Sequence, residues 1–186
     1  VKGVRIGIKL PDTVNIMIEE ESVVYAIKSS DGQWWMMDSD GRVVEQANNA
    51  KAATATQVLG VTLEAPTVNE KGVATEMTPS ETNELGELIP VTTTGAQRLT
   101  AALQILKALE NNDIVGEAAS VDVTSTEDII LWYGTRYQVN LGDTSRLDYK
   151  VDCMNDAILQ MSDYQSGVLD ISFTIWPNQV GYTPFA

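Results

Sequence analysis

The chain has 186 residues, of which 44% are hydrophobic, and its 26 acidic and 12 basic residues give a net charge of −14. This length and apolar content suffice for one or two compact domains, whereas the acidic balance argues against nucleic-acid binding, which needs a basic surface. Since the chain also lacks histidine, the commonest general base and metal ligand, we expect a protein that is not an enzyme and that binds no metal or cofactor.

Alternating apolar residues predict strands near the start of the chain. Residues 4–10 and 13–20 have a period of two, which fits two strands joined by a turn at Pro11-Asp12 or one long strand bent there. Residues 22–30 predict a further strand. Residues 33–38 and 42–46, joined by a turn of the sequence SDG, predict the clearest hairpin in the chain.

Two amphipathic helices are predicted further along. Residues 64–95 are rich in Glu, Thr, Pro and Gly and predict a long loop with short strands at most. Residues 95–113 and 141–164 then each carry an apolar stripe at helical spacing. Within the second segment, Ser145 is followed three positions later by Asp148, which resembles a capping box with a shorter acid. The two predicted stripes are Leu99, Leu103, Leu106 and Leu109, and Leu147, Val151, Met154, Ile158 and Met161.

Three strands are predicted between the helices, at residues 118–124, 128–134 and 135–141, and the tail after Gly167 returns to strand character. The order is strands, helix, strands, helix, strands. We therefore predict an α+β fold, with a mainly antiparallel β-sheet and two principal amphipathic helices.

Candidate sites for chemistry have simpler structural interpretations. The acidic turn from Asp38 to Gly41 lacks the further ligands of a calcium loop, so a hairpin turn is the better interpretation. The many glutamates between Glu19 and Glu87 show no spacing that singles out the two carboxylates of a glycosidase, and solvated acidic surfaces explain them better. Cys153, the single cysteine, is expected to be a buried thiol on the second helix.

Two aromatic pairs leave a carbohydrate-binding module open as an alternative function. Trp34-Trp35 and Trp132-Tyr133 each lie within a predicted strand. Because adjacent strand residues face opposite sides, each pair is expected to provide one core ring and one outward ring. An outward Trp34 or Trp132 could stack on a sugar of the cell wall.

Several segments resemble the FtsQ/DivIB family of bacterial cell-division proteins. Residues 4–27 resemble the end of the family's POTRA module, and residues 37–46, MDSDGRVVEQ, resemble the hairpin that opens its β domain. Leu59-Gly60-Val61 resembles a short element that follows. Residues 120–151 are similar to the Gram-positive members, and SGVLDIS at 166–172 resembles the family's closing strand.

This resemblance implies a domain division and a function. Residues 1–28 are expected to be the C-terminal part of a POTRA-like module, whose first half the chain lacks, and residues 29–186 a β domain. The resemblance implies a non-enzymatic scaffold in the cell membrane, with this region extracytoplasmic at the division septum and an N-terminal transmembrane helix, not present in this chain, as the anchor. The implied partners are the bitopic division proteins of the FtsB/DivIC and FtsL types.

The apolar tail is the predicted partner-binding segment. The family is thought to bind its partner through its last strands, and a partner strand can add to an open sheet edge by β-augmentation. Leu169 and Ile171 are expected to face the core. The residues expected at the interface are Ile175, Trp176, Val180, Tyr182 and Phe185, with the last two as aromatic anchors.

Overall fold

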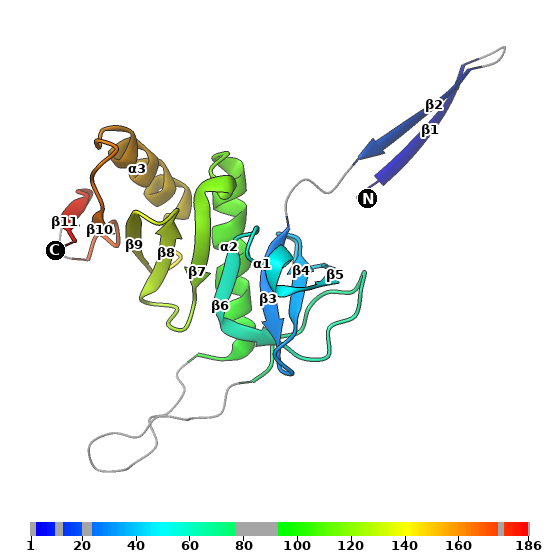
Figure 1. Cartoon of the computed structure of the whole chain (residues 1–186), viewed down its shortest axis with the longest axis horizontal. Coiled ribbons are helices and arrows are strands. Elements are labelled where there is room, and N and C mark those ends of the chain that lie inside the picture. The colour runs from blue at the N-terminus through cyan, green and yellow to red at the C-terminus, as the bar shows by residue number, and fades with distance from the viewer. Residues whose placement is uncertain (1–2, 10–12, 20–23, 77–92, 175–176, 186) are drawn as a thin grey trace, which may run out of the picture.

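The structure is a computed structural model that describes residues 3–9, 13–19, 24–76, 93–174 and 177–185 (Figure 1). The first two segments form β1 (Gly3–Lys9) and β2 (Thr13–Glu19), which pair antiparallel as a two-stranded sheet. This hairpin confirms the two strands predicted at the start of the chain.

The main sheet has nine strands in the order β11-β10-β9-β8-β7-β6-β3-β4-β5, with β11 and the C-terminus at one end and β5 at the other (Figure 1). Five of its eight neighbouring pairs are antiparallel, which confirms the predicted α+β class with a mainly antiparallel sheet. The strands are β3 (Tyr25–Ser29), β4 (Trp34–Met37), β5 (Val43–Ala47), β6 (Gln57–Leu63), β7 (Ala118–Asp122), β8 (Ile129–Tyr133), β9 (Tyr137–Gly142), β10 (Gly167–Asp170) and β11 (Gly181–Pro184).

Three neighbouring pairs are parallel, which the sequence patterns did not predict. They are β3–β6, β6–β7 and β9–β10. Parallel neighbours need a long crossover, usually through a helix. Helices α2 (Gly95–Asn111) and α3 (Leu147–Leu159) lie in the crossovers from β6 to β7 and from β9 to β10. The predicted long loop belongs to the first of these crossovers, and its residues 77–92 lie outside the described part of the chain.

The helix α2 confirms the first predicted helix. Thr94 caps its N-terminus by accepting a hydrogen bond from the N–H of Gln97, whose side chain in turn accepts one from the N–H of Thr94. Leu99, Leu106 and Leu109 of the predicted stripe are buried against the sheet. The helix therefore forms because a reciprocal cap and an apolar stripe coincide.

The helix α3 confirms the second predicted stripe but not its cap. Val151, Met154 and Ile158 are buried, and Leu147 and Met161 pack on the same core. The predicted capping box of Ser145 and Asp148 is wrong. Ser145 instead donates its N–H and hydroxyl to the carboxylate of Asp143, so Arg146 becomes the N-cap, in a left-handed conformation and without a side-chain cap.

The helices cover the two faces of the main sheet unequally. The helices α2 and α3 pack on one face over the main core. The short α1 (Asn49–Ala52) covers the other face only near β3 to β5, where Ala52 packs with Ala26, Met36 and Ala47. Over β6 to β11 no helix of the described residues covers this second face, which we call the open face.

The predicted boundary between residues 28 and 29 falls inside β3. Because β3 pairs with β4 and β6, its first residues Tyr25 to Lys28 belong to the nine-stranded sheet together with the strands that follow. The assignment of the two parts to a POTRA-like module and a β domain stays a prediction.

Candidate functional site: the free edge at β11

The strand β11 lies at one end of the main sheet and pairs only with β10 among the described residues. The pairing is antiparallel, with Leu169 opposite Tyr182 and Val168 opposite Thr183. The N–H of Phe185 donates to the carbonyl of Ser166, at 3.1 Å. Along an antiparallel strand, residues whose N–H and C=O point toward the neighbouring strand alternate with residues whose N–H and C=O point away from it. This one bond therefore shows which residues of β11 face β10.

Tyr182 and Pro184 direct their backbone groups away from the sheet. Gly181, Thr183 and Phe185 are the residues that bond inward to β10, as the bond from Phe185 to Ser166 requires. The free edge therefore presents the N–H and C=O of Tyr182 and the C=O of Pro184, since proline has no N–H. A partner strand could form a short ladder with these groups.

The opposite edge of the sheet is partly occupied by the chain itself. The N–H of Val43 at the start of β5 donates to the carbonyl of Glu70, and its carbonyl accepts from the N–H of Asn69. The N–H of Gly72 donates to the carbonyl of Gly41 just before β5. The two edges thus differ: the start of β5 is occupied, whereas no described residue pairs with the outward backbone groups of Tyr182 and Pro184 in β11.

The structure places the predicted interface residues in three different situations. Val180 and Tyr182 are half-buried against the protein's own core, and the Tyr182 hydroxyl donates to the carbonyl of Ser166 at 3.1 Å. Phe185 is 42% exposed, and its ring stacks on Trp132 with 6.2 Å between centroids. Ile175 and Trp176 lie outside the described residues. Leu169 and Ile171 are fully buried, which confirms their predicted place in the core.

The two aromatic pairs split between the faces of the sheet as predicted. Trp34 packs with the α1 side of the sheet, under the ammonium of Lys28 at 4.9 Å, whereas Trp35 packs on the main core. Tyr133 packs on the main core, whereas Trp132 carries the ring of Phe185. A role of Trp34 or Trp132 in carbohydrate binding stays a prediction.

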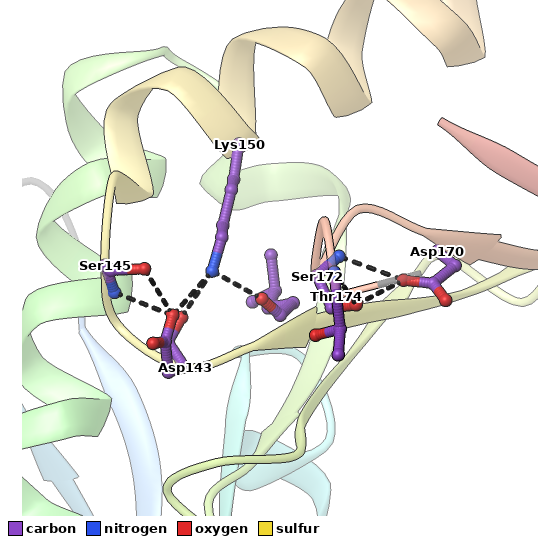
Figure 2. A network of polar contacts seen from close by, with 7 residues as sticks. Asp143, Ser145, Lys150, Asp170, Ser172 and Thr174 are labelled. Carbon is purple, nitrogen blue, oxygen red and sulfur yellow. Dashed lines mark hydrogen bonds and ion pairs between the residues drawn. The ribbon is translucent and has the colours of Figure 1, made fainter. Parts of the chain in front are cut away.

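A buried lysine holds the turn between β9 and α3 (Figure 2). Lys150 is only 1% exposed, and its Nζ lies 2.8 Å from the carbonyl oxygens of Leu141 and Asp143 and from Oδ1 of Asp143. This contact was not predicted from the sequence. The helical spacing could have indicated that Lys150 is buried. Lys150 lies three residues after Leu147 and four before Met154, and so falls on the apolar stripe of the helix.

The same contact sets the protonation of the aspartate. The hydrogen bond from Lys150, followed by that from Ser145, lowers the pKa of Asp143 to about 2. The carboxylate is therefore ionised at neutral pH and accepts from both residues at once. This network fixes the end of β9, the parallel neighbour of β10, and so supports the strand on which β11 is built.

The remaining candidate positions have structural roles. The carboxylate of Asp38 accepts from the N–H of Arg42, and Gly41 adopts a φ of 80°, which supports the hairpin turn rather than a calcium loop. No group of three or more metal-ligating side chains occurs within the described ranges.

Cys153, which we expected to be buried, is half-buried. In the part of the chain that the structure describes, no helix has the length and apolar character to span a membrane.

Comparison with known proteins adds no family assignment. No family model matches the chain, and no curated protein matches it. The resemblance to the FtsQ/DivIB family therefore stays an expectation from sequence, and the function is inferred below from the geometry of β11 and its surroundings.

Proposed function

We propose that the chain is a non-enzymatic scaffold of the bacterial divisome that binds other division proteins by β-augmentation at β11. The partners are bitopic proteins of the FtsB/DivIC and FtsL types, and binding takes place outside the membrane at the septum. The whole protein is anchored by an N-terminal transmembrane helix. This proposal joins the family resemblance to the free edge of the main sheet at β11.

The observation that carries the proposal is the free backbone edge of β11. Tyr182 presents both an N–H and a C=O away from β10, whereas segment 69–72 occupies the start of β5 at the opposite edge. In β-augmentation, backbone hydrogen bonds supply much of the affinity, and side chains on alternate positions supply the specificity. Each such bond contributes about 0.5–1.5 kcal/mol.

The edge is also protected against pairing with a second copy of itself. Open edges promote aggregation unless they are short or interrupted. The strand β11 has only four residues and ends at Pro184, which removes one donor from the ladder. Because so short an edge offers few backbone hydrogen bonds, it favours a partner that also contacts the surrounding surface. Such a requirement makes binding selective, as a scaffold needs.

Calorimetric titration with the extracytoplasmic segments of FtsB/DivIC-type and FtsL-type proteins tests the proposal. Two variants separate backbone pairing from side-chain contacts. Tyr182→Ala and Tyr182→Pro both remove the ring and its hydrogen bond to Ser166, but only the proline removes the outward N–H. We expect Tyr182→Pro to bind at least about threefold more weakly than Tyr182→Ala.

Circular dichroism of both variants checks that they are folded before binding is compared. Equal affinities of the two folded variants contradict pairing at this edge. Absence of binding by the unaltered chain to both partner segments contradicts the proposed partners.

A further inference from the structure

A small acidic cavity lies on the open face, one strand inward from the free edge. Its volume is about 330 Å³. Asp170, Ser172 and Thr174, which contribute to it, lie at the end of β10 and just after it (Figure 2). The other lining residues come from β8, from Asp128 just before it, and from β9, with Gln138 and Asn140 at successive open-face positions of β9.

The cavity is rich in hydrogen-bond acceptors and contains no positive charge. The residues that line it include Asp128 and Asp170 and no lysine or arginine. The Oδ1 atom of Asp170 accepts from the N–H and the hydroxyl of Ser172, at 3.0 and 2.7 Å, which holds the carboxylate in place. The Asn140 side-chain oxygen accepts from Gln138 at 3.3 Å. The described residues thus orient a carboxylate in a cavity without providing a cation for it.

The cavity can be reached from the free edge across a glycine. Asp170 lies opposite Gly181 of β11 in the antiparallel register, so both face the open side of the sheet. Because Gly181 has no side chain, the surface between the edge and Asp170 is not obstructed at this position. A strand added outside β11 would place its nearest Cα about 10 Å, or two strand spacings, from the Cα of Asp170. An extended lysine or arginine side chain and the side chain of Asp170 can together bridge this distance.

We propose that the partner strand carries an arginine or lysine opposite Gly181, and that this side chain passes over Gly181 to bind Asp170 in the cavity. The inference rests on the proposed strand addition and adds the chemistry of the partner to it. Charge complementarity supports this occupant, since the chain has a net charge of −14 and the cavity is lined by two aspartates and no basic residue. Charged hydrogen bonds of this kind are shorter and stronger than neutral ones.

A bound metal ion explains the cavity less well than a basic side chain does. A calcium site needs six or more oxygen ligands, and among the described residues no three metal-ligating side chains cluster anywhere. A single cation on a long side chain needs only the oriented carboxylate and its amide neighbours.

The cavity can be tested without any partner by two-dimensional amide NMR of the intact chain. The probe is Nα-acetyl-arginine amide, and its matched control is Nα-acetyl-citrulline amide, which has nearly the same shape and no charge. We expect saturable shifts at Asn140, Asp170, Gly181 and Ser172 with the arginine probe only. In Asp170→Asn, which keeps the acceptor for Ser172, affinity falls about tenfold.

Shifts of equal size from the citrulline control, or shifts that do not cluster at these residues, contradict the proposal. Equivalent saturable shifts with calcium chloride alone assign the cavity to a metal ion and also contradict it. A titration of the partner segments then uses Gly181→Val, whose backbone φ is not in the left-handed region and whose side chain covers the path to Asp170. This variant is expected to lose the charge-dependent part of the affinity.

The two proposals can fail separately. If the partner segments do not bind but the arginine probe does, the proposed function fails while the cavity remains a cation site. If the segments bind with the same affinity to Asp170→Asn, Gly181→Val and the unaltered chain, the scaffold function stands and the assignment of the cavity is wrong.

Discussion

The Nζ of Lys150 lies 2.8 Å from the backbone carbonyl oxygen of Leu141, so the buried ammonium of a residue on α3 donates a hydrogen bond to the end of β9. Lys150 is only 1% exposed, and the same Nζ donates its other two hydrogen bonds to the carbonyl oxygen and Oδ1 of Asp143. A buried ammonium is tolerated only when it is paired and hydrogen-bonded. The contact therefore fixes the junction from which β10, and next to it β11, continue.

Replacing Lys150 with Met tests this contribution. Methionine keeps most of the apolar stem but removes all three hydrogen bonds, which leaves the carbonyl of Leu141 without its partner. We expect a loss of about 1–3 kcal/mol in the free energy of unfolding, measured by urea denaturation. Lys51→Met is the matched control, because Lys51 makes an exposed ion pair with Glu45 and its loss should cost less than about 1 kcal/mol. Equal losses in the two variants contradict the assigned role.

The network also predicts a pH dependence of stability. The pKa of Asp143 is about 2 in the folded protein, against an ordinary value of 3.8, so its contribution is fully present above about pH 4. This contribution is lost as the pH falls from about 4 to about 2. Because the Asp143 side chain is 57% exposed, we expect it to amount to less than about 1 kcal/mol.

Thermal unfolding of the unaltered chain and of Asp143→Asn between pH 2 and pH 7 measures this effect. The asparagine variant should be less stable at neutral pH, and the difference should disappear toward pH 2. A difference that stays constant over this range contradicts the role of the ionised carboxylate.

The local elements of this fold could be predicted from sequence, but the connections between distant strands could not. Alternation and helical spacing marked the hairpin of β4 and β5 and the buried stripes of α2 and α3 because these patterns depend on neighbours along the chain. The parallel pairing of β9 with β10 depends on how α3 packs. No short-range pattern encodes that packing.

The candidate site shows the same limit. The apolar tail drew attention to the last strand, and the structure places β11 at the sheet edge. The identity of the outward residues, however, follows from the bond between Phe185 and Ser166, which fixes the phase of the ladder. Tyr182 was expected to be an anchor because it is aromatic, yet its ring packs on the protein's own core and its backbone faces outward.

A glycine in β6 is expected to be intolerant of substitution. Gly60 has a φ of +81°, and a Cβ at this position would lie 2.2 Å from the backbone nitrogen of Thr124. We expect Gly60→Ala to lower the free energy of unfolding by about 2–4 kcal/mol, through the left-handed conformation and the overlap. Gly116→Ala is the control, since no atom lies within 4 Å of its Cβ position. Similar stabilities of the two variants in urea denaturation contradict this explanation.

Proline at the end of β11 is expected to limit partner affinity. Pro184→Ala adds an N–H that points away from β10 and extends the ladder by one donor. We expect the partner segment to bind about two- to tenfold more tightly in calorimetry, with more self-association at high concentration. Thr183→Ala is the control because the N–H of residue 183 bonds inward to β10. If Pro184→Ala binds no more tightly than Thr183→Ala, the outward direction of residue 184 is contradicted.

Amide hydrogen exchange at two neighbouring residues tests strand addition at β11 most directly. In the free chain, the outward N–H of Tyr182 should exchange rapidly, whereas the N–H of Thr183, bonded to β10, should be protected. On addition of the partner segment, we predict that exchange at Tyr182 slows by at least about tenfold while Thr183 remains protected. If the partner binds and Tyr182 continues to exchange at its original rate, the partner does not pair with this edge.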